Sequence, residues 1–188
     1  MTPLDIIRKY YEPDSKAYYY LIHHSRLVAR KALEIAENVG HLNPDKKFIE
    51  EAAMLHDIGI FLTDAPKLGC YGYRDYLCHG FLGRDLLDRE GMPEHALVCE
   101  RHVGVGITAE DVRNNSLPLP ERDMVPLSVE EKIICFSDKF YSKIERNMEH
   151  EKPLGEVRKI IIKYGEEKLR MFDEWVKVFA QKQSNGFR

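Results

Sequence analysis

The sequence predicts an all-α protein that folds as a single helical bundle. Along nearly every long segment, apolar residues recur with the 3.6-residue period of a helix. Sustained apolar alternation flanked by hairpin turns, the pattern typical of β-strands, is not found. The 188 residues are 44% hydrophobic and 31% charged, which suits one well-packed domain. We expect one domain over residues 1–183, with a bundle core at about 16–150, a helical segment at about 154–181 and a flexible tail at 184–188.

The first long helix is predicted over Lys16–Val39, and Gly40 ends it. Its apolar stripe includes His24, which shares a face with Val28. His23 adjoins His24, but neighbouring residues lie about 100° apart around a helix, so only one of the two can face the core. The stripe therefore selects His24 as the inward-facing histidine.

The second helix begins at Asn43, an N-cap residue that is followed by Pro44 at the first helical position. Gly59 is expected to end it, which places His56 and Asp57 in its last turn. There the negative end of the helix dipole favours a bound cation by roughly 0.3–1 kcal/mol. This helix thus presents an imidazole and a carboxylate together at its C-terminal end.

The middle of the chain is expected to contain a loop and two helices. Glycine, proline and aspartate mark Phe61–Tyr73 as a loop. A third helix carries His79 on its apolar face. A fourth helix, which runs from Pro93 to the break at Gly104, carries His102.

The C-terminal third is again expected to be mostly helical. Asp138 lies on a long helix, and Gly165 could bend the last segment. The expected elements are a short helix opened by the capping box Thr108–Asp111, a loop over Asn114–Pro126, a helix from Ser128 to Ile144 and a helical segment over Leu154–Ala180.

Charge and composition argue against several classes of partner. A formal net charge of -3 disfavours non-specific binding of nucleic acid polymers and of anionic membranes, both of which need a basic surface. The N-terminal residues lack the apolar stretch of a signal peptide, and no later run reaches the length of a membrane span. We therefore expect a cytoplasmic protein with a small-molecule partner. The four cysteines are scattered and are expected to be free core thiols: Cys70, Cys78, Cys99 and Cys135.

A set of histidines and aspartates indicates a metal site. The pair His56-Asp57 offers a cation one neutral nitrogen and one anionic oxygen from adjacent residues. Alone the pair is weak, because such dipeptides occur by chance and a single buried histidine is more often a hydrogen-bonded core residue than a ligand. A helical bundle could, however, bring four more residues to this pair from separate helices. These four are His24, His79, His102 and Asp138.

In their order along the chain, these residues form the pattern H, HD, H, H, D, which resembles that of the HD-domain superfamily. The run His56–Gly59 is similar to its HDIG subset. Three further segments resemble the superfamily around its ligands, namely His24–Val28, His79–Gly83 and Phe136–Lys139. The stretches Glu100–Thr108 and Leu127–Asp138 are similar to a group of uncharacterised HDIG proteins, and the extra histidines resemble HD hydrolases that cleave diadenosine tetraphosphate.

The resemblance implies a helical bundle around two divalent metal ions and a metal-dependent phosphohydrolase activity. Its substrate would be a nucleotide, for example a dinucleoside polyphosphate, or another small phosphoester attacked by a metal-bridging hydroxide. His56 and Asp57 would be the catalytic residues, and Asp57 would bridge the ions. One ion would be held by His24, His56, Asp57 and Asp138, and the other by Asp57, His79 and His102. Four imidazoles and two carboxylates favour iron or manganese, with nickel, cobalt and zinc as alternatives, over magnesium.

Two other functions stay open because the same ligand set serves them. Some members of the superfamily are mixed-valence diiron oxygenases, and a non-catalytic nucleotide-binding regulatory domain is a third candidate. The last helical segment is apolar enough to form either core or the seam of a homodimer.

The sequence offers several side chains for substrate recognition. Five cations could bind phosphate or could simply be solvated surface charges: Arg26, Lys67, Arg74, Arg101 and Lys139. Three tyrosines could stack on a base or could cover the bundle: Tyr71, Tyr73 and Tyr76.

Overall fold

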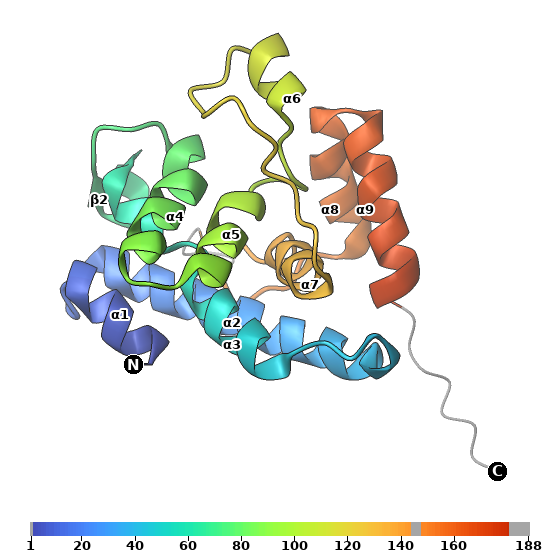
Figure 1. The fold of residues 1–188 in the computed structure, drawn as a ribbon, viewed down its shortest axis with the longest axis horizontal. Coiled ribbons are helices and arrows are strands. Elements are labelled where there is room, and N and C mark those ends of the chain that lie inside the picture. Colours follow the sequence, from blue (N-terminus) through green and yellow to red (C-terminus); the bar gives the residue numbers. More distant parts are fainter. Residues whose placement is uncertain (1, 144–147, 181–188) are drawn as a thin grey trace.

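The computed structural model describes residues 2–143 and 148–180, and its helices confirm the all-α prediction (Figure 1). The helix end predicted at Ile144 and the tail predicted at 184–188 lie outside the described residues. The α-helices are α1 (Pro3–Tyr10), α2 (Lys16–Asn38), α3 (Lys46–Leu55), α4 (His79–Arg89), α5 (Pro93–Arg101), α6 (Ala109–Asn114), α7 (Val129–Asp138), α8 (Leu154–Ile161) and α9 (Glu166–Phe179).

Helix α2 runs along one side of the molecule and is the longest element of the bundle. Ser15 caps its N-terminus, because the Ser15 side chain accepts a hydrogen bond from the backbone N–H of Tyr18. Helices α3 and α7 pack against α2, and α4 packs against α5 above them (Figure 1). Helices α8 and α9 lie side by side at one end, where Phe172 and Trp175 bury their rings.

Two apolar clusters form the core, and α2 contributes to both. The half of α2 up to Ile22 packs with α1, α4 and α5, whereas the half from Leu27 packs with α7, α8 and α9. Helix α3 also contributes to both clusters. Leu55 belongs to the cluster that contains Ile22, and Ala53 belongs to the cluster that contains Leu27. His24 lies between the two parts of α2, so the polar residues discussed below lie at the boundary between the two clusters.

The N-terminal helix α1 was not expected from the sequence. Thr2 and Asp5 form a capping box, in which the Thr2 side chain accepts from the Asp5 N–H and the Asp5 carboxylate accepts from the Thr2 N–H. Pro3 occupies the first helical position, and Ile6 and Ile7 are buried. The helix has only eight residues and therefore shows few periods of its apolar pattern.

The segment predicted as a loop contains short regular elements. A two-residue antiparallel pair forms between β1 (Asp64–Ala65) and β2 (Cys70–Tyr71). Single helical turns flank or join these strands: η2 (Ile58–Leu62), η3 (Pro66–Leu68) and η4 (Tyr76–Cys78). Turns also occur at η1 (Gly40–Leu42) and η6 (Ile162–Tyr164).

Several predicted helix boundaries were wrong. Helix α3 starts at Lys46 with Asp45 as its N-cap, rather than after Asn43, and α5 ends at Arg101, before Gly104. Helix α3 ends at Leu55, so His56 and Asp57 follow the helix rather than occupy its last turn, and Gly59 lies in η2. Helix α7 ends at Asp138, and the described residues directly after it are not helical. The last segment bends at Gly165, as its sequence indicated, and forms two helices, α8 and α9. Gly165 has a φ of 119°, a value that glycine adopts far more readily than other residues.

Among the described residues, none of the helices combines the length and the apolar character that a bilayer crossing requires. The four cysteines are all buried.

Candidate metal centre

The structure brings together the six histidine and aspartate residues that the sequence singles out. All are at most 8% exposed, and five of them lie at the end of a helix or directly after one. They are His24 within α2, His56 and Asp57 directly after α3, His79 at the start of α4, His102 directly after α5 and Asp138 at the end of α7. The bundle therefore places these side chains in one small polar centre.

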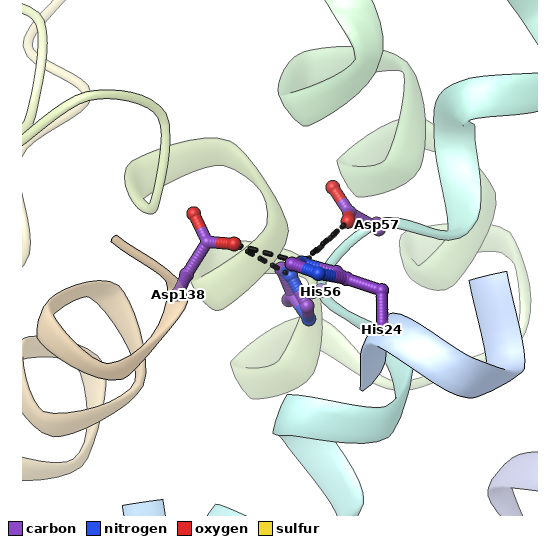
Figure 2. A group of neighbouring side chains, drawn as sticks. All are labelled: His24, His56, Asp57 and Asp138. Carbon is purple, nitrogen blue, oxygen red and sulfur yellow. Dashed lines mark hydrogen bonds and ion pairs between the residues drawn. The ribbon is translucent and has the colours of Figure 1, made fainter. Parts of the chain in front are cut away.

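The first group, called here site 1, consists of His24, His56, Asp57 and Asp138 (Figure 2). Its ligand atoms all lie within 4.8 Å of one another. His24 Nε2 is 2.8 Å from Asp138 Oδ1 and 3.4 Å from Asp57 Oδ2. His56 Nε2 is 3.2 Å from the same Asp57 oxygen. Two imidazole nitrogens and two carboxylate oxygens therefore converge on a single point.

The second group, called here site 2, consists of Asp57, His79 and His102. Asp57 Oδ1 lies 3.3 Å from His79 Nε2 and 3.4 Å from His102 Nε2. Asp57 thus directs Oδ2 to site 1 and Oδ1 to site 2. A carboxylate in this position could bridge two metal ions.

Three of the histidines are oriented by the same backbone contact. In each, Nδ1 lies within hydrogen-bonding distance of the carbonyl oxygen three residues earlier, and as the donor it would leave Nε2 with its lone pair directed to the centre. The distances are 2.6 Å for His56 to Ala53, 2.6 Å for His79 to Tyr76 and 2.7 Å for His102 to Cys99. The helix ends therefore fix the ring orientation that a metal ligand needs.

The donor set fits a bound cation. Among the described residues, His56 Nε2 and both oxygens of Asp57 are buried and form no well-directed hydrogen bond. Their nearest polar neighbours are the other candidate ligands and the ammonium of Lys143, which forms an ion pair with Asp57 Oδ2. Buried polar atoms without partners cost free energy, and a cation coordinated by these nitrogens and oxygens would satisfy them. The mixture of imidazole and carboxylate suits a transition metal.

The surroundings hold both carboxylates ionised. Burial opposes charge on Asp57, but His56 and Lys143 keep the pKa of Asp57 well below its usual range. Burial likewise opposes charge on Asp138, and Lys139 and Lys143 keep its pKa well below the usual range. Both residues are therefore available as anionic ligands at neutral pH.

His24 and His102 differ from His56 in how the surroundings shift their pKa values in the metal-free chain. Burial lowers the pKa of His24 to about 4 and that of His102 to about 3, so both rings are neutral near pH 7 and ready to bind a metal. Burial also opposes charge on His56, but Asp57 and Asp138 raise its pKa to about 9. Metal binding at neutral pH should therefore displace a proton from His56.

We expect the metal-free chain to lose stability when the pH falls from 6.5 towards 4. In the unfolded chain His24 and His102 bind protons near pH 6.5, whereas in the folded chain they stay neutral until about pH 4 and about pH 3. The unfolded state binds more protons in this range, so the free energy of unfolding should fall by about 1.4 kcal/mol per pH unit for each histidine. His56 adds nothing to this loss, because its folded pKa of about 9 lies above the unfolded value and its ring is protonated in both states once the pH is well below 6.5.

Urea unfolding of chelator-treated protein at pH 6.5 and pH 5.0 measures this effect. The variant His102→Gln should show a shallower pH dependence, since it removes one of the two groups. A free energy of unfolding that does not change between these pH values would contradict the assignment of two buried neutral histidines.

The structure places the predicted phosphate-binding cations at different distances from the centre. Lys139 lies against it, because its Nζ donates to Asp138 Oδ2 at 2.7 Å and to the carbonyl of His102 at 3.0 Å. Arg101 is directed to α7, where it pairs with both oxygens of Glu131 at 2.9 and 3.1 Å. The remaining three are exposed, and in the part of the chain that the structure describes none of them forms an ion pair with the six residues: Arg26 on α2, Lys67 in η3 and Arg74 before η4.

Of the three tyrosines, one contacts the centre. The ring of Tyr76 stacks on that of His79 at a centroid distance of 4.8 Å. Tyr71 and Tyr73 are 79% and 82% exposed, which leaves them at the surface of the loop before α4.

Sequence reasoning missed Lys143. Its Nζ lies 2.8 Å from Asp57 Oδ2 and 3.9 Å from Asp138 Oδ1. The only available signal was its position five residues after Asp138, but a continuous helix would have turned Lys143 away from that residue. Because α7 ends at Asp138, the chain instead brings Lys143 back to the centre.

The comparisons with known proteins agree with this geometry. The HD domain family matches residues 21–143, a span that contains all six candidate ligands. A tRNA (cytidine(56)-2'-O)-methyltransferase of Thermoplasma volcanium is 31% identical over 76% of this chain and 36% of its own length. An uncharacterized protein of Methanocaldococcus jannaschii is 33% identical over 63% of this chain and 64% of its own length.

A second tRNA (cytidine(56)-2'-O)-methyltransferase, from Picrophilus torridus, is 29% identical over 65% of this chain and 31% of its own length. The chain thus spans about a third of the methyltransferases that it matches and just under two thirds of the uncharacterized protein. No solved structure matches the chain. The resemblance predicted from the order of the histidines and aspartates is confirmed by the family match over residues 21–143, and the chain belongs to the HD-domain family.

Proposed function

We propose that this chain is a metal-dependent phosphohydrolase that acts on a nucleotide or another small phosphoester. The observation that supports the proposal most directly is the position of Asp57, whose two oxygens face two separate sets of histidines. Membership of the HD-domain family supports the same class of reaction. When bound, two cations would acidify a water molecule for attack on phosphorus and would neutralise charge on the phosphate oxygens.

The residues of the chain would contribute orientation and charge. Asp57 would set the spacing of the two sites, and the backbone contacts at Nδ1 of three histidines would keep their Nε2 atoms directed inward. Burial of the centre limits competing water and strengthens electrostatic interactions with a bound phosphate. Lys139 and Lys143 add positive charge beside the two carboxylates, which favours an anionic substrate.

We propose two divalent transition metal ions, with iron or manganese preferred. Replacement of His102 with alanine should reduce the manganese content from two ions per chain to one, because site 2 would keep only His79 and Asp57. Metal analysis after gel filtration measures the ratio. The matched control is His95→Ala, because His95 lies on α5 but its ring packs on Phe48 and its Nε2 lies 3.6 Å from Glu51, away from the centre. Equal manganese content in His102→Ala and wild type would contradict the two-ion arrangement.

The activity is tested by anaerobic turnover of a phosphoester panel by protein that carries manganese or ferrous iron. The panel should contain nucleoside mono- and triphosphates, dinucleoside polyphosphates and sugar phosphates. Nucleoside 2'- and 3'-phosphates belong in it as well, because two relatives carry a name that refers to the 2' oxygen of a tRNA nucleotide. Release of phosphate or of a nucleotide without oxygen would support hydrolysis.

The alternative is a mixed-valence diiron oxygenase, which the same ligand set permits. Oxygen consumption that requires iron, with no product under anaerobic conditions, would favour the oxygenase and contradict the phosphohydrolase. A chain that binds nucleotide and metal but turns over neither class of substrate would favour a regulatory domain.

A further inference from the structure

Lys143 lies in the segment after α7 and contacts the carboxylate that both sites share. Its Nζ lies 2.8 Å from Asp57 Oδ2 and 3.9 Å from Asp138 Oδ1, and its side chain is 17% exposed. It therefore reaches the carboxylate shared by both sites while part of it faces solvent. A buried ammonium needs anionic partners, and Asp57 and Asp138 hold the pKa of Lys143 well above its usual value although burial opposes the charge.

The two lysines beside the centre, Lys139 and Lys143, differ in the groups that their ammonium groups contact. Lys139 donates to Asp138 Oδ2 and to the carbonyl of His102, so its ammonium is committed to protein acceptors that join α5 to α7. Lys143 contacts Asp57, which is also the proposed bridging ligand. When Asp57 Oδ2 ligates a cation, its negative charge is shared with that cation, and the donors of Lys143 become available to another anion.

Tyr76 connects Lys143 to site 2. The Tyr76 hydroxyl forms a hydrogen bond with Lys143, and the Tyr76 ring stacks on His79 at 4.8 Å. The Tyr76 carbonyl lies 2.6 Å from His79 Nδ1. Tyr76 comes from η4 and Lys143 from the segment after α7, so two segments outside the long helices form one polar wall beside the two sites.

We propose that Lys143, positioned by Tyr76, binds a phosphoryl oxygen of the substrate beside site 1. This assignment rests on the proposed phosphohydrolase function. It identifies the recognised group as an anionic phosphoryl oxygen within reach of both the metal ligands and the ammonium. Charge-assisted hydrogen bonds to phosphate are among the stronger polar contacts in proteins, so one lysine here can dominate recognition of the phosphoryl group.

The test uses the full chain loaded with manganese and inorganic phosphate as the probe. Isothermal titration calorimetry should show that Lys143→Met weakens phosphate binding by about 10-fold to 100-fold while two manganese ions per chain are retained. Lys143→Arg should recover most of the affinity, because it keeps the positive charge. The matched control is Lys47→Met, which removes a lysine whose side chain is 85% exposed on α3 and should leave phosphate affinity unchanged.

Tyr76→Phe tests the positioning role separately. It should weaken phosphate binding in the wild-type background but have no further effect when combined with Lys143→Met, since Tyr76 acts through the lysine. An equal loss in both backgrounds would contradict that role and leave Tyr76 as an independent contact.

Two other results would overturn the assignment of Lys143. If Lys143→Met binds manganese more tightly and phosphate as wild type does, Lys143 is only the counter-ion of Asp57 in the metal-free chain. If wild type hydrolyses a phosphoester and Lys143→Met does so with unchanged KM and kcat, the inference fails while the proposed function stands. If wild type hydrolyses none of the panel but binds phosphate through Lys143, the proposed function fails while the anion-binding role of Lys143 stands.

Discussion

Asp57→Asn should abolish phosphoester hydrolysis and remove metal from both sites. Asparagine keeps the size of the side chain but lacks the charge that Asp57 Oδ2 offers to site 1 and Oδ1 offers to site 2. Loss of metal-dependent charge stabilisation costs several kcal/mol in the transition state, so kcat/KM should fall by about 1000-fold or more. Steady-state kinetics on the best substrate of the panel and metal analysis of the same sample measure the two effects together.

Asp85→Asn is the matched control for this substitution. Asp85 is exposed on α4, the helix that begins with His79, and the change removes the same charge from the protein. It should leave activity and metal content unchanged. Hydrolysis by Asp57→Asn at a rate within about tenfold of wild type, with metal retained, would mean that another group performs the bridging role.

The membership of the centre could be predicted because its residues have few other reasons to be buried. Histidine and aspartate are costly to bury without partners, so their appearance on apolar helix faces indicates a shared polar site. His24 shows this well, since its stripe was readable from the spacing to Val28 and the structure buries it completely. That these residues bind metal and catalyse a reaction stays a prediction.

The local geometry could not be predicted because it depends on where helices stop. Periodicity continues past Leu55 and past Asp138, but α3 and α7 end at these residues. The early end of α7 brings Lys143 to Asp57, a contact that a longer helix would have prevented. Helix ends respond to tertiary contacts more than to the local pattern, and functional residues concentrate there.

The short strands in the segment predicted as a loop could not be predicted for a similar reason. Gly72 and the strands β1 and β2 form a compact turn over η2, where a Cβ atom at Gly72 would overlap the backbone of Leu62. Glycine and proline in the sequence indicated a loop there. Two-residue strands are too short to leave an alternating pattern.

Gly59→Ala should lower the free energy of unfolding more than a typical surface substitution does, and it should disturb site 2. A Cβ atom at Gly59 would overlap the carbonyl oxygen of His79 and would lie 2.5 Å from the backbone nitrogen of Gly83. Both neighbours are backbone atoms of α4, so the clash is relieved only if the whole helix moves away from η2. Overpacking of a rigid contact costs about 1–3 kcal/mol or more, and the free energy of unfolding should fall by that amount.

Gly40→Ala is the control, because a Cβ atom at Gly40 would meet no atom of the described residues within 4 Å. Urea unfolding should therefore give Gly40→Ala nearly the stability of wild type and Gly59→Ala a clear loss. Since His79 is the first residue of α4, a displaced helix also carries its imidazole away from Asp57 Oδ1, which lies 3.3 Å from Nε2. Manganese bound at site 2 should thus be lost before manganese at site 1, whose ligands come from α2, α7 and the two residues that follow α3. Unchanged stability together with two bound ions in Gly59→Ala would show that α4 can shift without cost, and the close approach at Gly59 would then not explain why glycine follows the His-Asp pair.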